Sequence, residues 1–412
     1  MENKSFGEKL IEFIKKYAMV IVLFGVFVAF YFMTGKKIIW PSNVSNLIGQ
    51  NAHVFILATG MLLCILTGGN IDLSVGSVVC FTSAVGATLM AVMGVPAPIC
   101  VVAMAFLGIL IGATQAFFIA YVRIPPFIVT LAGMFIFRGF GRIVLKGGKS
   151  ISLHPYEGFL KVFGGGADCY LPDVYTLITG KRVLTSSGDP INITCIVVGV
   201  VCVCIFVALQ IINRMRRKAK KYEVDNLVGW IIKLVLISGV ALAFTERLSK
   251  YNGIPSTLVI VGLVVLIYTY ITTNTKTGRY FYAVGGNEKA TKLSGINTNW
   301  TYFLAYMNMG FLASLAGMLT MARAMASEPN AGTNYEMDAI ASCFIGGAAA
   351  YGGTGTVPGA IIGALLMGLI NIGMNICKFD MNLQSVVKGG VLLAAVFFDV
   401  VSKRRFKIIS KD

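Results

Sequence analysis

Apolar residues fill long stretches of this chain, and short polar or glycine-rich segments separate them. A helix needs about 17 or more apolar residues to cross a hydrocarbon core about 30 Å thick. Eleven stretches reach this length: residues 17–34, 51–67, 75–95, 99–122, 127–145, 191–212, 227–244, 256–273, 300–323, 357–377 and 384–401. A twelfth apolar run, residues 338–350, is shorter and leads into the glycine-rich stretch 352–359.

The positions of the basic residues test this count, because Lys and Arg accumulate in cytoplasmic loops. With residues 1–16 inside and twelve crossings, the inner loops hold 20 of the 35 Lys and Arg residues and the outer loops hold 10. With eleven crossings, the basic tail 403–411 would lie outside. We therefore expect an all-α, polytopic membrane bundle of about twelve helices, within a range of ten to twelve, with both termini in the cytoplasm.

Composition agrees with a membrane protein. Of 412 residues, 56% are hydrophobic and 13% are charged, which leaves more apolar surface than one soluble core could bury. The formal net charge of +17 is already explained by the membrane topology, so it gives little support to nucleic-acid binding.

A single transmembrane domain, residues 1–412, accounts for the whole chain. Residues 17–34 are expected to remain as an anchor, because no small-residue cleavage pattern follows them. Three extramembrane segments are predicted: an outer insert at 146–190, rich in turn formers, a basic cytoplasmic loop at 213–226, and a second cytoplasmic loop at 274–299.

The sequence offers little enzyme chemistry, and we predict no catalytic residue, cofactor or metal site. His53 and His154 lack partners at ligand spacing, and eight of the nine cysteines fall in or beside apolar helices. Residues 143–150 end like a phosphate-binding loop but lack its first glycine.

Lys388 is expected to extend toward a membrane surface, and no buried relay of Asp, Glu or His can be assembled. This weakens an ion-coupled mechanism and leaves the energy to a partner.

Small residues recur at helix-packing spacing, as in Gly108-x-x-x-Gly112 and Gly359-x-x-x-Gly363. Such positions allow membrane helices to approach closely. Tight packing explains most of them, and a polar solute path along some of them is the alternative.

The cytoplasmic segment 277–296 is the most informative. Asn287 is a suitable N-cap, Glu288 complements the helix dipole, and Gly295 can end a helix in the left-handed conformation. The enclosed helix has about seven residues and needs a surface to stabilise it. It either lies on the lipid headgroups or docks into a cytoplasmic partner.

Glycine-rich turns occur at two further places, residues 67–76 and 351–359, and the second weakly repeats the first. The first turn also contains two residues that can cap the following helix. The residues that define both turns are Gly68, Gly69, Asp72, Ser74, Gly76, Gly352, Gly353, Gly355 and Gly359.

These motifs, in this order and over most of the chain, resemble the membrane permease subunits of bacterial ABC importers for monosaccharides, the ribose, xylose and galactose group. The basic stretch 214–221 and the segment 251–255 make the chain most similar to xylose-type or multiple-monosaccharide permeases. The insert 146–190 and the helix pair around 214–221 depart from shorter family members.

The resemblance implies a homodimer with the sugar path at its interface, two cytoplasmic ATP-binding subunits and an extracytoplasmic sugar-binding protein, in the bacterial plasma membrane. It also implies alternating access, driven through a coupling helix that fits a groove of the ATPase. The coupling residues are Gly285, Gly286, Asn287, Glu288, Lys289, Ala290, Lys292, Leu293, Ser294 and Gly295.

Two groups of charged residues lie on the predicted outer side. Arg138 and Arg142 share a helix face, and they either anchor its outer end or line the outer mouth. The acidic residues Glu328, Glu336 and Asp338 either help to dock the binding protein or are simply solvated.

Three alternatives stay open at this point. A related permease for nucleosides or branched-chain amino acids has much the same plan, an ion-coupled sugar carrier would work without the ATPase, and a passive channel would conduct without any partner.

Overall fold

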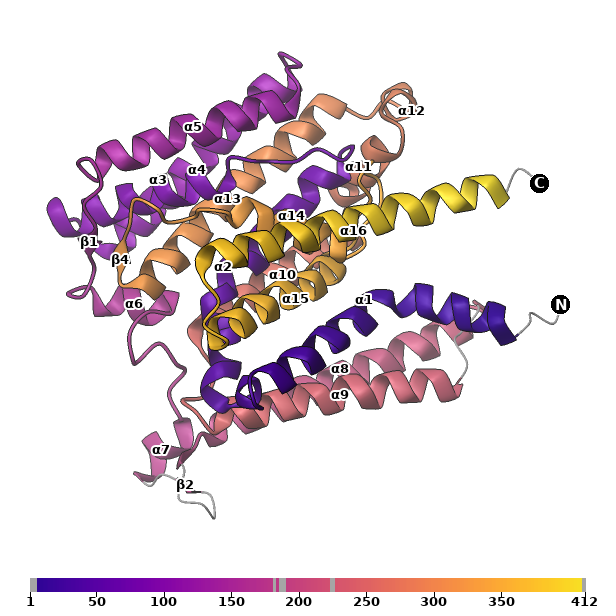
Figure 1. The fold of residues 1–412 in the computed structure, drawn as a ribbon, viewed down its shortest axis with the longest axis horizontal. Coiled ribbons are helices and arrows are strands. Elements are labelled where there is room, and N and C mark those ends of the chain that lie inside the picture. The colour runs from indigo at the N-terminus through magenta and orange to yellow at the C-terminus, as the bar shows by residue number, and fades with distance from the viewer. Residues whose placement is uncertain (1–5, 181–182, 185–189, 223–226, 410–412) are drawn as a thin grey trace.

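The computed structural model describes residues 6–180, 183–184, 190–222 and 227–409. Figure 1 shows a bundle of long helices with short elements at its two ends. The long helices are α1 (Phe6–Met33), α2 (Pro41–Leu66), α3 (Val75–Ala87), α4 (Ala97–Ala120), α5 (Pro126–Val144), α8 (Ile193–Ala219), α9 (Leu227–Ser249), α10 (Ser256–Asn274), α13 (Thr298–Ala324), α15 (Val357–Ile376) and α16 (Met381–Ile409). The short elements are η1 (Lys37–Ile39), η2 (Thr88–Val92), β1 (Ile151–Ser152), α6 (Glu157–Phe163), α7 (Val174–Thr179), β2 (Val183–Leu184), β3 (Pro190–Ile191), α11 (Lys276–Gly286), α12 (Glu288–Leu293), β4 (Ala326–Ser327) and α14 (Tyr335–Ile345).

Each of the eleven long apolar stretches forms a helix, which confirms the predicted all-α membrane fold. Eight helices in the described part of the chain are long and apolar enough to cross a membrane. α1 and α16 contribute the shorter apolar stretches Val20–Met33 and Met381–Phe397. Figure 1 places the start of α1 and the end of α16 on the same side as α12.

The twelfth predicted crossing, residues 338–350, has a different structure from the one expected. α14 has 11 residues, so it is about 16 Å long and reaches through only half of a bilayer. It follows β4 and the irregular segment that begins at Glu328. Within this segment Gly332 is buried, whereas Glu328, Asn330 and Thr333 are exposed.

α3 and α14 begin next to each other inside the bundle. A Cβ on Gly76 would lie 2.0 Å from the carbonyl oxygen of Gly332, just before α14. The turn at Gly69 meets Ala350, just after α14. The segment that leads into α3 therefore runs along α14 in the opposite direction. The two units, α2–α3 and α13–α14, thus resemble an inverted pair.

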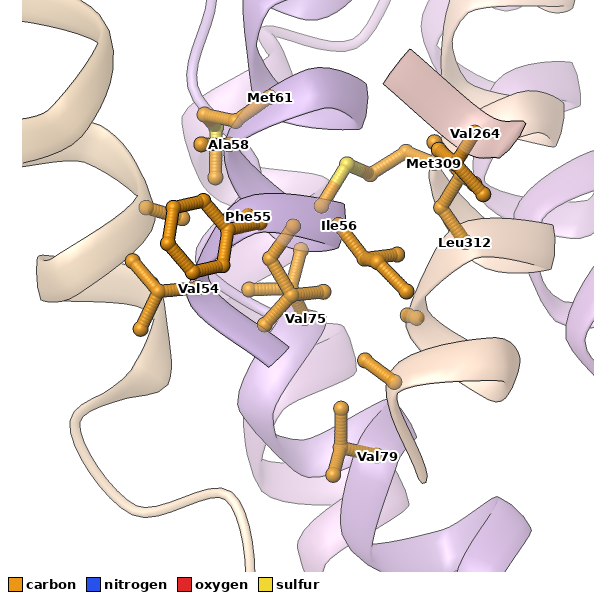
Figure 2. Close-up of a cluster of buried hydrophobic side chains, with 14 of the residues drawn as sticks. Val54, Phe55, Ile56, Ala58, Met61, Val75, Val79, Val264, Met309 and Leu312 are labelled. Carbon is orange, nitrogen blue, oxygen red and sulfur yellow. The ribbon is translucent and has the colours of Figure 1, made fainter. Parts of the chain in front are cut away.

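The core is centred on α2, which packs against α10, α13, α14 and α15, and α3 joins the same cluster through α13 (Figure 2). Ile56 and Met61 of α2 are fully buried, as are Met309 and Leu312 of α13. Because lipid tails are as apolar as these side chains, close packing and not the hydrophobic effect holds such helices together.

Small residues provide the closest helix contacts, as the sequence predicts. A Cβ on Gly108 of α4 would lie 2.5 Å from the carbonyl oxygen of Gly310 on α13, and one on Gly112 would lie 2.6 Å from that of Tyr306. A Cβ on Gly363 of α15 would lie 2.0 Å from the carbonyl oxygen of Ser342 on α14. These glycines therefore serve packing.

α8 and α9 form a hairpin beside this core. α8 continues as a helix to Ala219, so residues 213–219 are helical and not part of a loop as expected, while 223–226 lie outside the described residues. At the opposite end of the bundle from α12, the insert 146–190 forms small elements, of which β1 pairs antiparallel with β4. This pairing ties the insert to the segment after α13.

Candidate functional site

α12 lies at one end of the bundle and has the geometry predicted for residues 287–295 (Figure 1). Asn287 Oδ1 accepts a hydrogen bond of 3.0 Å from the amide of Ala290, which confirms the N-cap. Gly295 follows with φ of +81°, the left-handed conformation expected at the end of the helix. The helix has six residues, close to the seven expected.

α11 precedes α12 directly and was not predicted. It ends at Gly286, so Gly285 and Gly286 are helical and not part of a loop. Thr291 Oγ1 donates a hydrogen bond of 2.8 Å to the carbonyl of Ala283 and thereby joins the two helices. The amphipathic pattern of residues 276–286 was the available signal for α11.

Glu288 attaches α12 to two other parts of the chain. Its Oε1 lies 2.7 Å from Nη1 of Arg123, in the connection between α4 and α5, and its Oε2 accepts a hydrogen bond of 3.1 Å from the Tyr302 hydroxyl of α13. Partial burial tends to raise the pKa of Glu288, but the charge and hydrogen bonds of Arg123 together with Tyr302 bring it below its usual value. Glu288 is therefore ionised and holds α12 to the bundle.

Arg123 completes this attachment. Its Nη2 donates a hydrogen bond to Oδ1 of Asn299, and its guanidinium lies 5.6 Å from the centre of the Tyr302 ring. No role for Arg123 could be inferred from the sequence, because its partners are more than 160 residues away along the chain.

The other face of α12 is open to solvent. Leu293 is 89% exposed. The neighbouring exposed residues are Lys289, Ala290, Lys292, Ser294 and Gly295. α12 thus presents a small basic surface with one apolar side chain at its end.

The three glycine motifs of the sequence meet beneath α11 and α12. A Cβ on Gly285 would lie 1.8 Å from the carbonyl oxygen of Leu66 and 2.5 Å from the amide nitrogen of Gly353. The amide of Gly353 also donates a hydrogen bond of 3.1 Å to the Leu66 carbonyl. Backbone therefore touches backbone at this point, which only glycine permits.

The first and last motifs also touch each other directly. Gly69 and Gly352 both have positive φ angles, +76° and +83°. A Cβ on Gly69 would lie 2.0 Å from the Ala350 carbonyl oxygen, and one on Gly352 would lie 2.5 Å from the Cα of Gly68. Motifs almost 300 residues apart in the chain thus form one glycine junction, defined here as Gly68, Gly69, Gly285, Gly352 and Gly353.

The rest of the last motif starts α15. The Tyr282 hydroxyl of α11 donates a hydrogen bond of 2.9 Å to the carbonyl of Gly355. Thr356 then caps α15 by accepting a hydrogen bond of 3.1 Å from the amide of Gly359. α11 is therefore connected to the start of α15 as well.

The rest of the first motif is buried and ends at the start of α3. Asp72 Oδ1 accepts hydrogen bonds from the amide of Ser74 at 2.8 Å and from its hydroxyl at 2.7 Å. Gln115 of α4 donates a further hydrogen bond of 2.9 Å to the Ser74 hydroxyl. Ser74 occupies the N-cap position without a side-chain capping bond, so neither residue caps α3 in the predicted way. They form a turn that is fixed to α4.

Asp338 lies in the interior, which corrects its assignment to an outer acidic loop. It is 1% exposed, and its Oδ2 lies 2.9 Å from Nζ of Lys388 on α16. Asn371 of α15 contributes a hydrogen bond of 3.4 Å and is itself linked to Asn51 of α2. Lys388 therefore forms an internal ion pair and does not extend to a membrane surface. Asp338 is therefore a buried carboxylate, whereas the sequence led us to expect that no buried relay of Asp, Glu or His could be assembled.

A cavity of about 350 Å³ lies near this ion pair, between α2, α13 and the start of α14. His53 and Tyr335 stack in its wall, with their ring centres 3.6 Å apart. Thr320 and Arg323 line it from α13, and Glu328 from the segment after β4. The cavity combines an aromatic surface with hydroxyl, guanidinium and carboxylate groups, as sites for polar solutes do.

The remaining charged residues of the predicted outer side have different environments. Arg138 donates a hydrogen bond of 2.5 Å to the carbonyl of Ala331 and so holds the segment before α14, whereas Arg142 is exposed. Glu336 is half-buried near Gly76, and Glu328 is exposed. Of the three predicted docking carboxylates, Glu328 alone is fully at the surface.

No cluster of His, Cys, Asp or Glu suited to a metal ion occurs in the described part of the chain. All nine cysteines are free, and most are buried.

Comparison with known proteins identifies the family. The family described as branched-chain amino acid transport system / permease component matches residues 43–396. The xylose transport system permease protein of Haemophilus influenzae is 34% identical over 389 residues, which cover 94% of this chain and 97% of that protein. The ribose import permease protein of Escherichia coli strain K12 is 33% identical over 358 residues, which cover 87% of this chain and 85% of that protein.

No solved structure matches the chain. The family match covers most of the sequence, and the helical bundle agrees with it. This chain is therefore a multi-pass membrane permease that belongs to the branched-chain amino acid transport system / permease component family.

Proposed function

We propose that this chain is the membrane subunit of an ATP-driven importer of monosaccharides, with xylose, ribose and galactose as the nearest candidates. The relatives named above are permeases for xylose and for ribose, at 33–34% identity over most of their length. The chain works as a homodimer in the bacterial plasma membrane, with both termini in the cytoplasm. Two ATP-binding subunits and an extracytoplasmic sugar-binding protein complete the importer.

The observation that carries this proposal is the position of α12. The helix is too short to be stable by itself, yet it is capped at both ends and held by Glu288. Its outer face exposes Leu293 beside Lys289 and Lys292. Such a surface suits a groove in a partner, because a buried leucine contributes affinity and the lysines direct the approach.

The contacts of α11 and α12 provide a route for a mechanical signal. A displacement of α12 acts on Arg123 and α13 through Glu288 and Tyr302. The same displacement acts on the ends of α2 and α15 through Gly285 in the glycine junction. Both units of the inverted pair thus receive the movement, and alternating access is the response that we propose.

The cavity lined by His53 and Tyr335 is a suitable outer entrance for the solute. Its volume of about 350 Å³ is at the small end of the range for ligand sites, and its wall offers hydroxyl and charged groups to a polyol. The exposed Glu328 lies at its rim and is available to the sugar-binding protein. Asp338, which pairs with Lys388, follows the cavity residue Tyr335 by three positions on α14.

Uptake measurements test the proposal. Cells that express this chain with its ATP-binding subunit and binding protein are given radiolabelled xylose, ribose, galactose, leucine or uridine. We expect ATP-dependent accumulation of at least one pentose or hexose and none of leucine or uridine. Accumulation of leucine or uridine instead would favour the related permeases of the same family, and uptake without the ATP-binding subunit would favour a carrier.

A further inference from the structure

The hairpin of α8 and α9 has little contact with the rest of the bundle. Only 6% of the most apolar window of α8 is buried, compared with 83% for α2. The surface of α8 is therefore mostly free to contact lipid. The proposed transport route, through α12 and the glycine junction, does not use this hairpin.

The seam between α8 and α9 contains two adjoining cavities of opposite character. The first, of about 370 Å³, is lined almost entirely by apolar side chains such as Val198, Val203 and Ala241. The second, of about 250 Å³, is polar. Phe206 and Ile237 line both, so the two cavities adjoin along one seam.

The polar cavity is basic and lies at the end of α8 that is on the same side as α12 (Figure 1). Arg214 and Arg217 line it from α8, and Lys233 lines it from α9. The Arg214 guanidinium lies 4.9 Å from the centre of the Trp230 ring, which fixes its position.

We infer that this seam binds an anionic phospholipid, with its phosphate in the cavity of Arg214, Arg217 and Lys233 and an acyl chain in the adjoining apolar cavity. Three cations at the boundary between apolar and basic residues suit a phosphodiester headgroup. Trp230 is the residue type that lies preferentially at this depth of a membrane.

The apolar cavity distinguishes a lipid from a free phosphate ion. A soluble phosphate would use the basic cavity alone and would leave the apolar seam without a role. The apolar cavity also opens directly to the bilayer, because Val198 and Cys202 on its wall are exposed. Lipid can thus enter sideways with its chain first.

The test measures retained lipid on the purified full-length chain. The protein is reconstituted in nanodiscs with phosphatidylcholine and 20% phosphatidylglycerol, extracted gently and weighed by native mass spectrometry. We expect the wild type to retain phosphatidylglycerol in preference to phosphatidylcholine. The double variant R214Q/R217Q should retain at least about tenfold less of it, because each cation near the surface contributes to binding.

Matched variants separate this site from general surface charge. K218Q/K220Q removes the same charge from exposed positions of the same segment and should retain phosphatidylglycerol like the wild type. K233Q leaves the contact between Arg214 and Trp230 in place, and it should still lower the retention of phosphatidylglycerol. A241W fills the apolar cavity and should lower retention without a change in charge.

Three results would overturn the inference. Retention that falls equally in K218Q/K220Q would indicate diffuse attraction to the surface. If R214Q/R217Q and K233Q both retain as much phosphatidylglycerol as the wild type, the basic cavity does not bind the lipid. Displacement of the bound lipid by millimolar inorganic phosphate, with A241W like the wild type, would show that the site binds a phosphate ion. Size-exclusion profiles confirm that each variant is folded.

Discussion

At the scale of single residues, the ion pair between Asp338 and Lys388 is the feature that could not be predicted from the sequence. Asp338 is 2% and Lys388 is 16% exposed at the side chain, and their charged atoms lie 2.9 Å apart. Removal of one of the two charges would destabilise the folded protein, because the other charge would stay buried without a partner of opposite sign. The pair therefore joins α14 to α16 as long as both members are present.

We expect K388M to lower the stability of the protein by about 3 kcal/mol, because it leaves the Asp338 carboxylate buried without its cation. The double variant D338N/K388M should recover most of this loss. Thermal unfolding of the detergent-purified protein, followed by fluorescence size-exclusion chromatography, compares the two. K250Q, which breaks the more exposed pair with Glu246, is the control and should have almost no effect.

If K388M and D338N/K388M unfold at the same temperature, the side chains act independently and the pair does not join the helices. If K250Q is as destabilising as K388M, the loss of a lysine itself is the cause. Either result contradicts the interpretation.

Neighbouring glycines provide the second test at this scale. A Cβ on Gly285 would lie 1.8 Å from the Leu66 carbonyl oxygen, whereas nothing lies within 4 Å of one on Gly286. We expect G285A to cost about 1–3 kcal/mol, because backbone atoms must move apart. G286A should be neutral or slightly stabilising, since alanine favours the helix.

We would compare the melting temperatures of G285A and G286A, and then their ATP-driven uptake. G285A should lose ATP-driven uptake even where the folded protein is recovered, because the glycine junction connects α11 to α2 and α15. Equal behaviour of the two variants would mean that the close contact is unimportant.

At the scale of elements, the sequence predicted the helices well and their lengths less well. Apolar run length fixes each long helix, and the caps of α12 follow from Asn287 and Gly295. α14 was expected to be a full crossing because its apolar run continues to Ala350, but the chain leaves the helix at Gly346. The contacts of Arg123 and Lys388 join distant segments, and no local pattern in one sequence encodes them.

α12 can be tested as an element through its cap. The amide of Ala290 donates the capping hydrogen bond to Asn287, and a proline at this position has no amide hydrogen. We expect A290P to abolish stimulation of the ATP-binding subunit by the permease while membrane insertion stays normal. A290S keeps the amide and should behave like the wild type. Normal coupled uptake by A290P would refute the role given to α12.

Leu293 tests the outer face of the same helix. Because this side chain is 89% exposed, L293D should leave the melting temperature unchanged. Its co-purification with the ATP-binding subunit should fall by about tenfold, because an interface anchor is replaced by a charge. L177D changes a leucine that is 71% exposed on α7, at the other end, and should bind the subunit normally. Equal binding by both variants would place the partner elsewhere.

At the scale of the whole molecule, the inverted pair connects the interior with the surface. α3 and α14 begin next to each other inside the bundle. The segment that leads into α3 comes from the end with α11 and α12, and the segment that leads into α14 comes from the opposite end, with β4. The buried turn at Asp72 follows the glycine junction directly, and Arg138 holds the segment that leads from β4 to α14 and Asp338. The two ends of the molecule are thus connected to the same small region.

The buried carboxylates of Asp72 and Asp338 also give an ion-coupled carrier more basis than the sequence suggested. The decisive measurement uses the purified chain alone in liposomes, with xylose or ribose outside and a proton or sodium gradient imposed. We expect no accumulation against a gradient, because Asp338 is paired with Lys388 and Asp72 is hydrogen-bonded to Ser74. In our proposal the driving movement comes instead from the ATP-binding subunit through α12. Addition of the ATP-binding subunit, the binding protein and ATP should start uptake in the same liposomes. Accumulation without them, lost in D338N, would make this chain a carrier in its own right.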